Sequence, residues 1–127
     1  MEYQGILSKA YNCSDPALRM VYIAAFNIAQ YHGTFDRMTK PYNPILGETN
    51  ELKTSEFKYI SEQVSHHPPI SACYAESNQG HYKLWLNTNM RSNFWGASFE
   101  ASPLGLVHIK LENLPGIYTA SRPSTFV

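Results

Sequence analysis

Two adjacent histidines followed by two prolines form the stretch whose residue types most suggest chemistry, SEQVSHHPPIS at 61–71. Imidazoles change charge near neutral pH and can donate hydrogen bonds to an anion. In a regular strand His66 and His67 would point to opposite faces. Pro68 and Pro69 restrict the backbone, so a strand must end or bend there. This bend can bring both rings to one rim as a phosphate site. The alternative is two solvated histidines at a strand end.

Two enzymatic alternatives use neighbouring residues. No H-E-x-x-H motif is present, and an adjacent pair seldom gives two well-oriented metal ligands without a carefully placed third. Ser65 beside His66 has the types of a nucleophile and a base, but sequence neighbours cannot adopt the required geometry and no G-x-S-x-G elbow exists. We therefore expect no enzyme, no metal and no cofactor. The candidate metal ligands would be His66, His67, His81 and His108 with Glu62 or Glu76.

A proline-rich stretch, TKPYNPILGET at 39–49, is the second candidate site. Lys40 and Asn43 each precede a proline, which pushes both toward extended backbone. Lys40 offers a permanent charge and Asn43 an amide donor, the groups that a phosphomonoester needs. The stretch is equally consistent with a stiff crossover from helix to sheet.

A helix is predicted ahead of this loop. Asp15 has the type of an N-cap, Pro16 suits the first helical position and Gly33 suits the end. Further apolar residues on other sides predict burial around most of the helix. A shorter helix is predicted around 2–11. The predicted apolar face consists of Leu18, Val21, Tyr22, Ala25, Ile28 and Ala29.

Short alternating segments predict strands from about residue 48 onward. They surround Ile70–Tyr74, Tyr82–Leu86 and Val107–Leu111, with turn signals at Asn78–Gly80 and Pro103–Gly105. No helical pattern intervenes, so an antiparallel meander is expected, forming part of a barrel or curved sheet. The predicted class is mixed α+β, mainly β.

Composition limits the classes of protein. The chain has 127 residues, of which 43% are hydrophobic and 16% charged, and ten basic residues balance ten acidic ones. These values indicate one globular domain with no overall field favouring nucleic acid. Cys13 and Cys73 have no metal-type spacing, and no secretory signal is visible, so reduced thiols in the cytosol are expected.

Several stretches resemble the oxysterol-binding-protein-related family of lipid transfer proteins. EQVSHHPP at 62–69 matches that family's fingerprint, and KPYNPILGE at 40–48 precedes it. MVYIAAFNIAQY, GETNEL and FWGASFEASPLG resemble further family stretches. The similarity runs over essentially the whole chain.

The resemblance implies N-terminal helices and an incomplete β-barrel around a hydrophobic tunnel. It implies binding and transfer of a sterol or phosphatidylserine, together with phosphatidylinositol 4-phosphate, by a cytoplasmic protein peripheral at organelle membranes. His66, His67, Lys40 and Asn43 would bind the phosphoinositide headgroup. Gln30 and Tyr31 would line the sterol end of the tunnel. The expected partners are these lipids and a transient membrane surface, without nucleic acid.

The family's domain is longer than this chain. We therefore expect residues 1–127 to be a partial ligand-binding domain whose lid and C-terminal part are missing. A truncated sensor or tether that does not transfer lipid is the alternative function. A partial barrel would leave strand edges unpaired.

Overall fold

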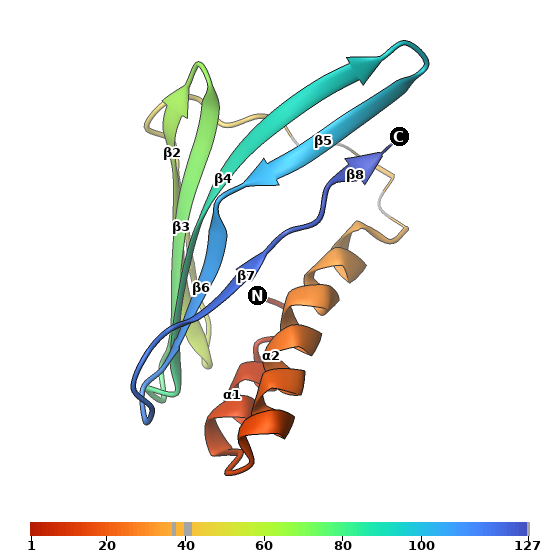
Figure 1. Cartoon of the computed structure of the whole chain (residues 1–127). Helices are drawn as coiled ribbons and strands as arrows, with labels where there is room; N and C mark the ends of the chain where they lie inside the picture. The colour runs from red at the N-terminus through yellow and green to blue at the C-terminus, as the bar shows by residue number, and fades with distance from the viewer. Residues whose placement is uncertain (37, 40–41, 127) are drawn as a thin grey trace.

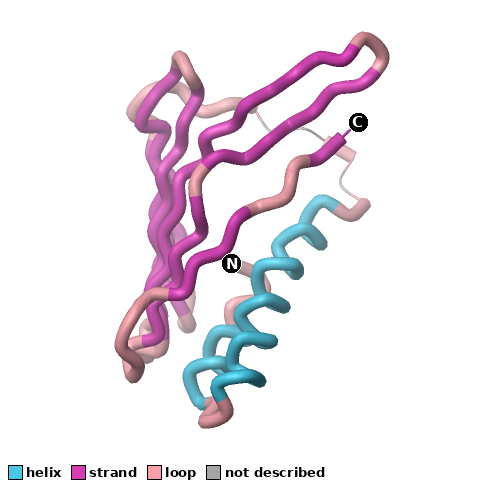
Figure 2. The backbone as a smooth tube through the Cα atoms, viewed as in Figure 1, coloured by secondary structure: helices cyan, strands magenta, loops and turns pink. Residues whose placement is uncertain are grey.

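The chain folds into two N-terminal helices and one antiparallel sheet (Figure 1). The computed structural model describes residues 1–36, 38–39 and 42–126. Both helices lie on one side of the sheet, which we call the helix-facing side; the opposite side is the outer side (Figure 2). The predicted mixed class, mainly β, is confirmed, and within the described residues the sheet is not closed. The predicted tunnel stays a prediction.

The helices begin where local chemistry indicates. Helix α1 spans Gly5–Asn12 and helix α2 spans Pro16–Ala29. The Asp15 side chain caps α2 by accepting a hydrogen bond from the backbone N–H of Ala17 at 2.8 Å. This bond satisfies one of the N–H groups that lack a partner in the first helical turn. The predicted start at Asp15 and Pro16 is therefore confirmed.

The helix ends differ from the predicted ones by a few residues. The α-helical part of the second helix ends at Ala29, and the chain continues as a 3₁₀ helix, η1, over Gln30–Thr34. Gly33, the predicted stop, lies inside η1. Such 3₁₀ turns are common at helix termini because they pair carbonyls that the α-helix leaves unbonded.

The prediction that α2 is buried on most of its surface is wrong. Its buried residues are Ile23 and Phe26, whereas Val21 is 60% exposed and Ile28 is 71% exposed. Because the helix is apolar around nearly its whole circumference, periodicity cannot choose which stripe faces the sheet. Packing against α1 and the sheet selects the stripe that contains Phe26.

The strands form an antiparallel arrangement, in the order β1-β2-β3-β4-β5-β8, with β6 joining β4 to β7. Strand β1 therefore lies at one edge, and its five residues are exposed. The strands are β1 (Thr49–Lys53), β2 (Phe57–His66), β3 (Pro69–Ser77), β4 (Tyr82–Trp95), β5 (Ser98–Leu104), β6 (Leu106–Leu111), β7 (Tyr118–Ser121) and β8 (Thr125–Phe126).

Strand β4 has two neighbours on the same edge. Its later half pairs with β5, ending at Asn89 opposite Leu104, and its earlier half pairs with β6, beginning at Leu86 opposite Val107. The two registers are continuous along β4, so β5 and β6 form one line that is interrupted at Gly105. Gly105 has a φ of +85°, which glycine adopts readily. The turn predicted at Pro103–Gly105 is therefore a kink within this line.

The core lies where α1 and α2 cover the sheet. The alternation predicted around Tyr82–Leu86 and Val107–Leu111 places Tyr82, Leu84, Val107, Ile109 and Leu111 in it. On β3 the more buried positions are Ala75 and Ser77, whereas Ile70, Ala72 and Tyr74 are partly exposed. The helices contribute Leu7, Ala10, Ile23 and Phe26 to the same cluster.

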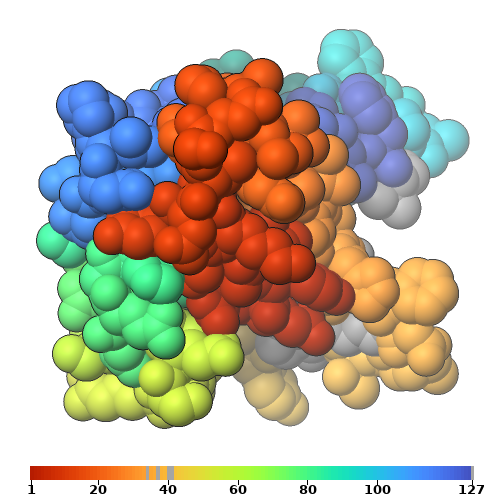
Figure 3. Space-filling view, turned by 90° about the horizontal axis from the view of Figure 1, so that it is seen from below, coloured from red at the N-terminus to blue at the C-terminus, as the bar shows by residue number. Residues whose placement is uncertain are grey.

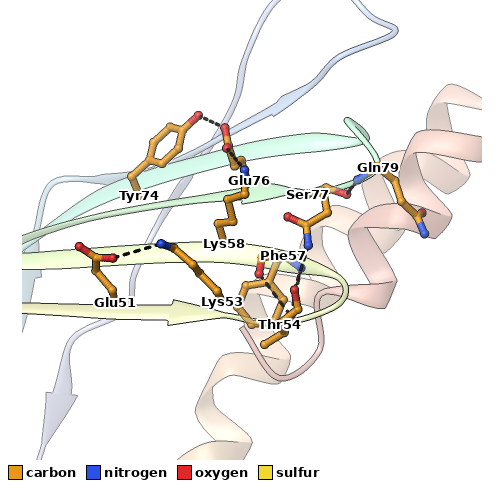
Figure 4. Close-up of polar contacts among 10 residues, drawn as sticks. Glu51, Lys53, Thr54, Phe57, Lys58, Tyr74, Glu76, Ser77 and Gln79 are labelled. Atoms are coloured by element: carbon orange, nitrogen blue, oxygen red, sulfur yellow. Dashed lines mark hydrogen bonds and ion pairs between the residues drawn. The ribbon is translucent and has the colours of Figure 1, made fainter.

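We call the end of the sheet that α1 and α2 cover the lower end, and the end with the β2–β3 and β4–β5 tips the upper end (Figure 1). The outer side carries charged and polar side chains near the lower end. Lys58 and Glu76 pair at 3.8 Å, and the Tyr74 hydroxyl donates to Glu76 at 3.1 Å (Figure 4). Seen from below, α1 and α2 occupy the middle of the molecule, beside the turns of the sheet (Figure 3). Within the described residues, neither helix has the length and apolarity required to cross a bilayer.

Candidate functional site

The two histidines meet at the tip of the β2–β3 hairpin. Strand β2 ends at His66 and β3 begins at Pro69, so His67 and Pro68, joined by a cis peptide bond, form the connection. The ring centroids of His66 and His67 lie 4.5 Å apart with planes at 63°, and both residues are exposed. The predicted convergence of the two imidazoles is observed. Their role in binding phosphate stays a prediction.

A β-bulge sets the side on which His66 lies. Gln63 pairs with Ser71, but His66 pairs with Pro69, which leaves one extra residue, around Val64, on β2. Residues directly opposite each other in an antiparallel pair point to the same side of a sheet. Gln63 is buried on the helix-facing side, and the shifted register places His66 on that side too. A regular strand would have placed His66 on the outer side.

The loop before β1 is fastened to β2 beside this bulge. The Gly47 N–H donates to the Gln63 carbonyl at 2.8 Å, and the Gln63 N–H donates to the Glu48 carbonyl at 3.0 Å. Within the loop, the Glu48 N–H donates to the Ile45 carbonyl at 3.0 Å, and a Glu48 carboxylate oxygen accepts from the Ile45 N–H at 2.8 Å. The loop is thus held three residues from His66.

The two predicted loop residues differ in what the structure describes. Asn43 is exposed and lies two residues before Ile45. The segment that leads into β1 runs at the end of the molecule that carries the β2–β3 tip (Figure 1). Lys40 lies outside the described residues. The structure therefore brings the loop of Asn43 to the histidine hairpin, and headgroup binding by Lys40 and Asn43 stays a prediction.

The predicted sterol-end residues lie on a different element. Gln30 and Tyr31 begin η1, at the C-terminal end of α2. The Gln30 amide donates to the Phe26 carbonyl at 3.2 Å, and Tyr31 is 43% exposed. Their place in a tunnel stays a prediction.

Neutral polar groups line the helix-facing side next to the hairpin. The Ser71 hydroxyl donates to the Gln63 side-chain oxygen, and the Ser71 N–H donates to the Thr88 hydroxyl at 3.2 Å. Further from the tip, burial raises the pKa of the Tyr59 hydroxyl and of the Cys73 thiol. Both groups therefore stay protonated at neutral pH, and this wall carries hydrogen-bonding groups without charge.

The other histidines occupy separate environments. The His81 ring stacks on Tyr11 with centroids 4.5 Å apart, and the His108 ring stacks on Trp85 at 5.4 Å. Over the part of the chain that the structure describes, no three His, Cys, Asp or Glu side chains are grouped as metal ligands. The predicted metal alternative gains no support from this geometry.

Sequence reasoning did not single out Gln63, Val64 or Glu48. The bulge near Val64 contains no glycine, which is the usual local signal for a bulge. The stretch at 39–49 was predicted only as a stiff loop, and the bond that the Glu48 side chain accepts depends on how the turn folds.

Comparisons with known proteins agree with this architecture. The family model "Oxysterol-binding protein" matches residues 1–127. The chain is 47% identical to human oxysterol-binding protein-related protein 7 over 114 residues, which are 87% of this chain and 13% of that protein. It is 41% identical to human oxysterol-binding protein-related protein 6 over 130 residues, which cover 100% of this chain and 14% of that protein.

Solved structures show the same fold. The ORD domain of Osh1 in complex with cholesterol superposes with a TM-score of 0.87 and 36% identity, over 98% of this chain and 31% of that one. The ORD of Osh3 in complex with PI(4)P from Saccharomyces cerevisiae gives 0.86 and 31%, over 98% of this chain and 34% of that one. The chain thus spans about a third of these domains. On the family match and these identities, the chain belongs to the oxysterol-binding protein family.

Proposed function

We propose that this chain is the part of a lipid transfer domain that recognises a phosphoinositide headgroup. In this proposal it binds a sterol or another lipid such as phosphatidylserine, and phosphatidylinositol 4-phosphate, and moves them between membranes without catalysing a reaction. Membership of the family supports lipid binding. Complexes of similar domains with cholesterol and PI(4)P support these two lipid classes.

The observation that carries the proposal is the pair of exposed imidazoles 4.5 Å apart, beside the loop of Asn43. Two neighbouring imidazoles can each donate a hydrogen bond to a different oxygen of one phosphate. The register places His66 on the helix-facing side of the sheet, the side that also carries the apolar core. A protein that works in this way meets membranes transiently, as a peripheral cytoplasmic protein.

The test compares lipid extraction from liposomes that contain phosphatidylinositol 4-phosphate or a sterol. The double variant His66→Ala, His67→Ala should weaken phosphoinositide extraction at least about tenfold, because hydrogen bonds to a charged group contribute about 1.5–3 kcal/mol. Sterol extraction should stay unchanged. His108→Ala removes an imidazole on another strand and serves as the control.

Wild-type phosphoinositide extraction by the double variant would overturn the headgroup assignment. Lipid binding without transfer from donor to acceptor liposomes would instead favour a sensor or tether. That second function is a candidate because the sheet formed by the described residues is open.

A further inference from the structure

Two sets of hydrogen bonds hold the loop between η1 and β1, one within the loop at Ile45 and one between the loop and β2 at Gly47. The first set joins Glu48 to Ile45 within the loop. The Glu48 N–H donates to the Ile45 carbonyl, and the Glu48 carboxylate accepts from the Ile45 N–H. The second set joins Gly47 and Glu48 to both backbone groups of Gln63. Removing the Glu48 side chain would leave the second set intact.

The turn itself has a fixed backbone requirement. Residues 45–48 form a four-residue turn, and Gly47 occupies its third position with a φ of +79°. A type II turn requires a positive φ there, which glycine adopts without strain. The Glu48 carboxylate adds a second bond to the turn, from the Ile45 N–H, next to Pro44 and Asn43 in the chain.

Gln63 connects this loop to the histidines. It is 4% exposed, its backbone holds the loop, and its side-chain oxygen accepts from Ser71 on β3. His66 follows three residues later on the same strand. The proposed headgroup site has two halves, Asn43 and the histidine pair. Both lie on segments whose positions are set by the buried residue Gln63.

The charge of Glu48 is unexpected at this place. A carboxylate beside a phosphate site repels the ligand, and the exposed Glu48 side chain belongs to none of the ion pairs among the described residues. Among the described residues, its side chain accepts a hydrogen bond from the Ile45 N–H.

We propose that Glu48 is a positioning residue of the headgroup site, which closes the 45–48 turn and thereby sets where Asn43 stands relative to His66 and His67. The inference rests on the proposed headgroup binding. The Glu48 side chain then has two opposing effects on ligand binding. Its acceptor oxygen holds the turn in place, whereas its negative charge repels the ligand.

Three variants test these two properties. Glu48→Ala removes both the acceptor and the charge, Glu48→Gln keeps an acceptor oxygen and removes the charge, and Glu51→Ala removes an exposed carboxylate from the neighbouring strand as the control. All three change the net charge equally. The probes are glycerophosphoinositol 4-phosphate, which carries the headgroup, and inorganic phosphate, which tests whether a free anion suffices.

Glu48→Ala should bind the headgroup probe about two- to threefold more weakly at low ionic strength, because the loss of a hydrogen bond of about 1 kcal/mol is partly offset by the removal of the repelling charge, and about fivefold more weakly in high salt. Glu48→Gln should bind it about twofold more tightly at low ionic strength, and this gain should disappear in high salt. Glu51→Ala should bind like wild type. Headgroup binding by Glu48→Ala at the wild-type level, or equally weak binding by both Glu48 variants, would overturn the inference.

A measurement without ligand keeps the inference distinct from the proposed function. Amide hydrogen exchange at Ile45 should be at least about fivefold faster in Glu48→Ala and close to wild type in Glu48→Gln, with exchange at Leu84 unchanged as a check of the fold. If wild type binds neither probe, the proposed function fails, and exchange at Ile45 still decides the role of Glu48. An unchanged Ile45 rate in Glu48→Ala contradicts the inference.

Discussion

The two ends of the molecule are built on different principles. At the lower end, α1 and α2 cover the sheet, and Phe26 and Tyr82 are almost completely buried. At the upper end, the β2–β3 and β4–β5 tips project beyond the helices, and Phe94 and Trp95 are 79% and 67% exposed (Figure 1). The same sheet therefore supplies stability at one end and accessible groups at the other.

The largest effect is expected from a cavity at the lower end. Phe26→Ala should lower the free energy of unfolding by about 3–5 kcal/mol, because the aromatic ring is 1% exposed and its removal leaves a void. Urea denaturation followed by circular dichroism measures the loss. A loss below about 1 kcal/mol would show that the lower end is not the stable one.

Alkaline pH should also act on the lower end. Burial and then the charge of Glu56 raise the pKa of Tyr82 to about 12, from an ordinary value of 10.0. The unfolded chain therefore releases this proton first, so the contribution of Tyr82 is complete below about pH 10 and is lost as pH rises toward 12. Urea denaturation at pH 9 and pH 11 measures the effect.

Tyr82→Phe is the matched variant for this pH dependence. It removes the hydroxyl that donates to the Gln4 side-chain oxygen at 3.2 Å, which should cost about 1 kcal/mol at neutral pH. Between pH 9 and 11 its stability should fall less steeply than that of wild type. Equal slopes would mean that other groups produce the alkaline loss.

The smallest effect is expected at the upper end. Phe94→Ala should change the free energy of unfolding by less than about 0.5 kcal/mol, because the side chain is mostly exposed and its ring contacts Phe99 on the adjacent strand at a centroid distance of 5.0 Å. The measurement is the same urea titration as for Phe26→Ala. A loss comparable to that of Phe26→Ala would remove the contrast between the two ends.

Features set by neighbouring residues were predicted from the sequence. Asp15 caps α2 because its side chain reaches the N–H two residues later, an interaction contained within one turn. The alternation of Val107, Ile109 and Leu111 gave the buried positions of β6, because one side of that strand is consistently apolar. Pro68 and Pro69 predicted that the strand ends or bends at the histidines, and β2 does end at His66.

Features that depend on distant partners were not predicted. The stripe of α2 that faces the sheet is selected by packing, so Val21 and Ile28 were misplaced and Phe26 was not distinguished. The bulge near Val64 can be recognised only from the shift in the pairing of β2 with β3. The position of Gly47 is likewise set by its hydrogen bond to Gln63 on another segment. Both shape the candidate site through contacts between segments.

Strand β1 has a consequence for behaviour at high protein concentration. As the first strand of the sheet order, it presents backbone groups along which the backbone of another molecule could pair. Glu51 and Lys53 stand on this short strand, 3.7 Å apart, with exposed side chains. A strand of another molecule that paired with β1 would have to desolvate both charged side chains. The cost of this desolvation therefore opposes fibril growth at β1. Because β1 has few residues, such pairing would also form few backbone hydrogen bonds.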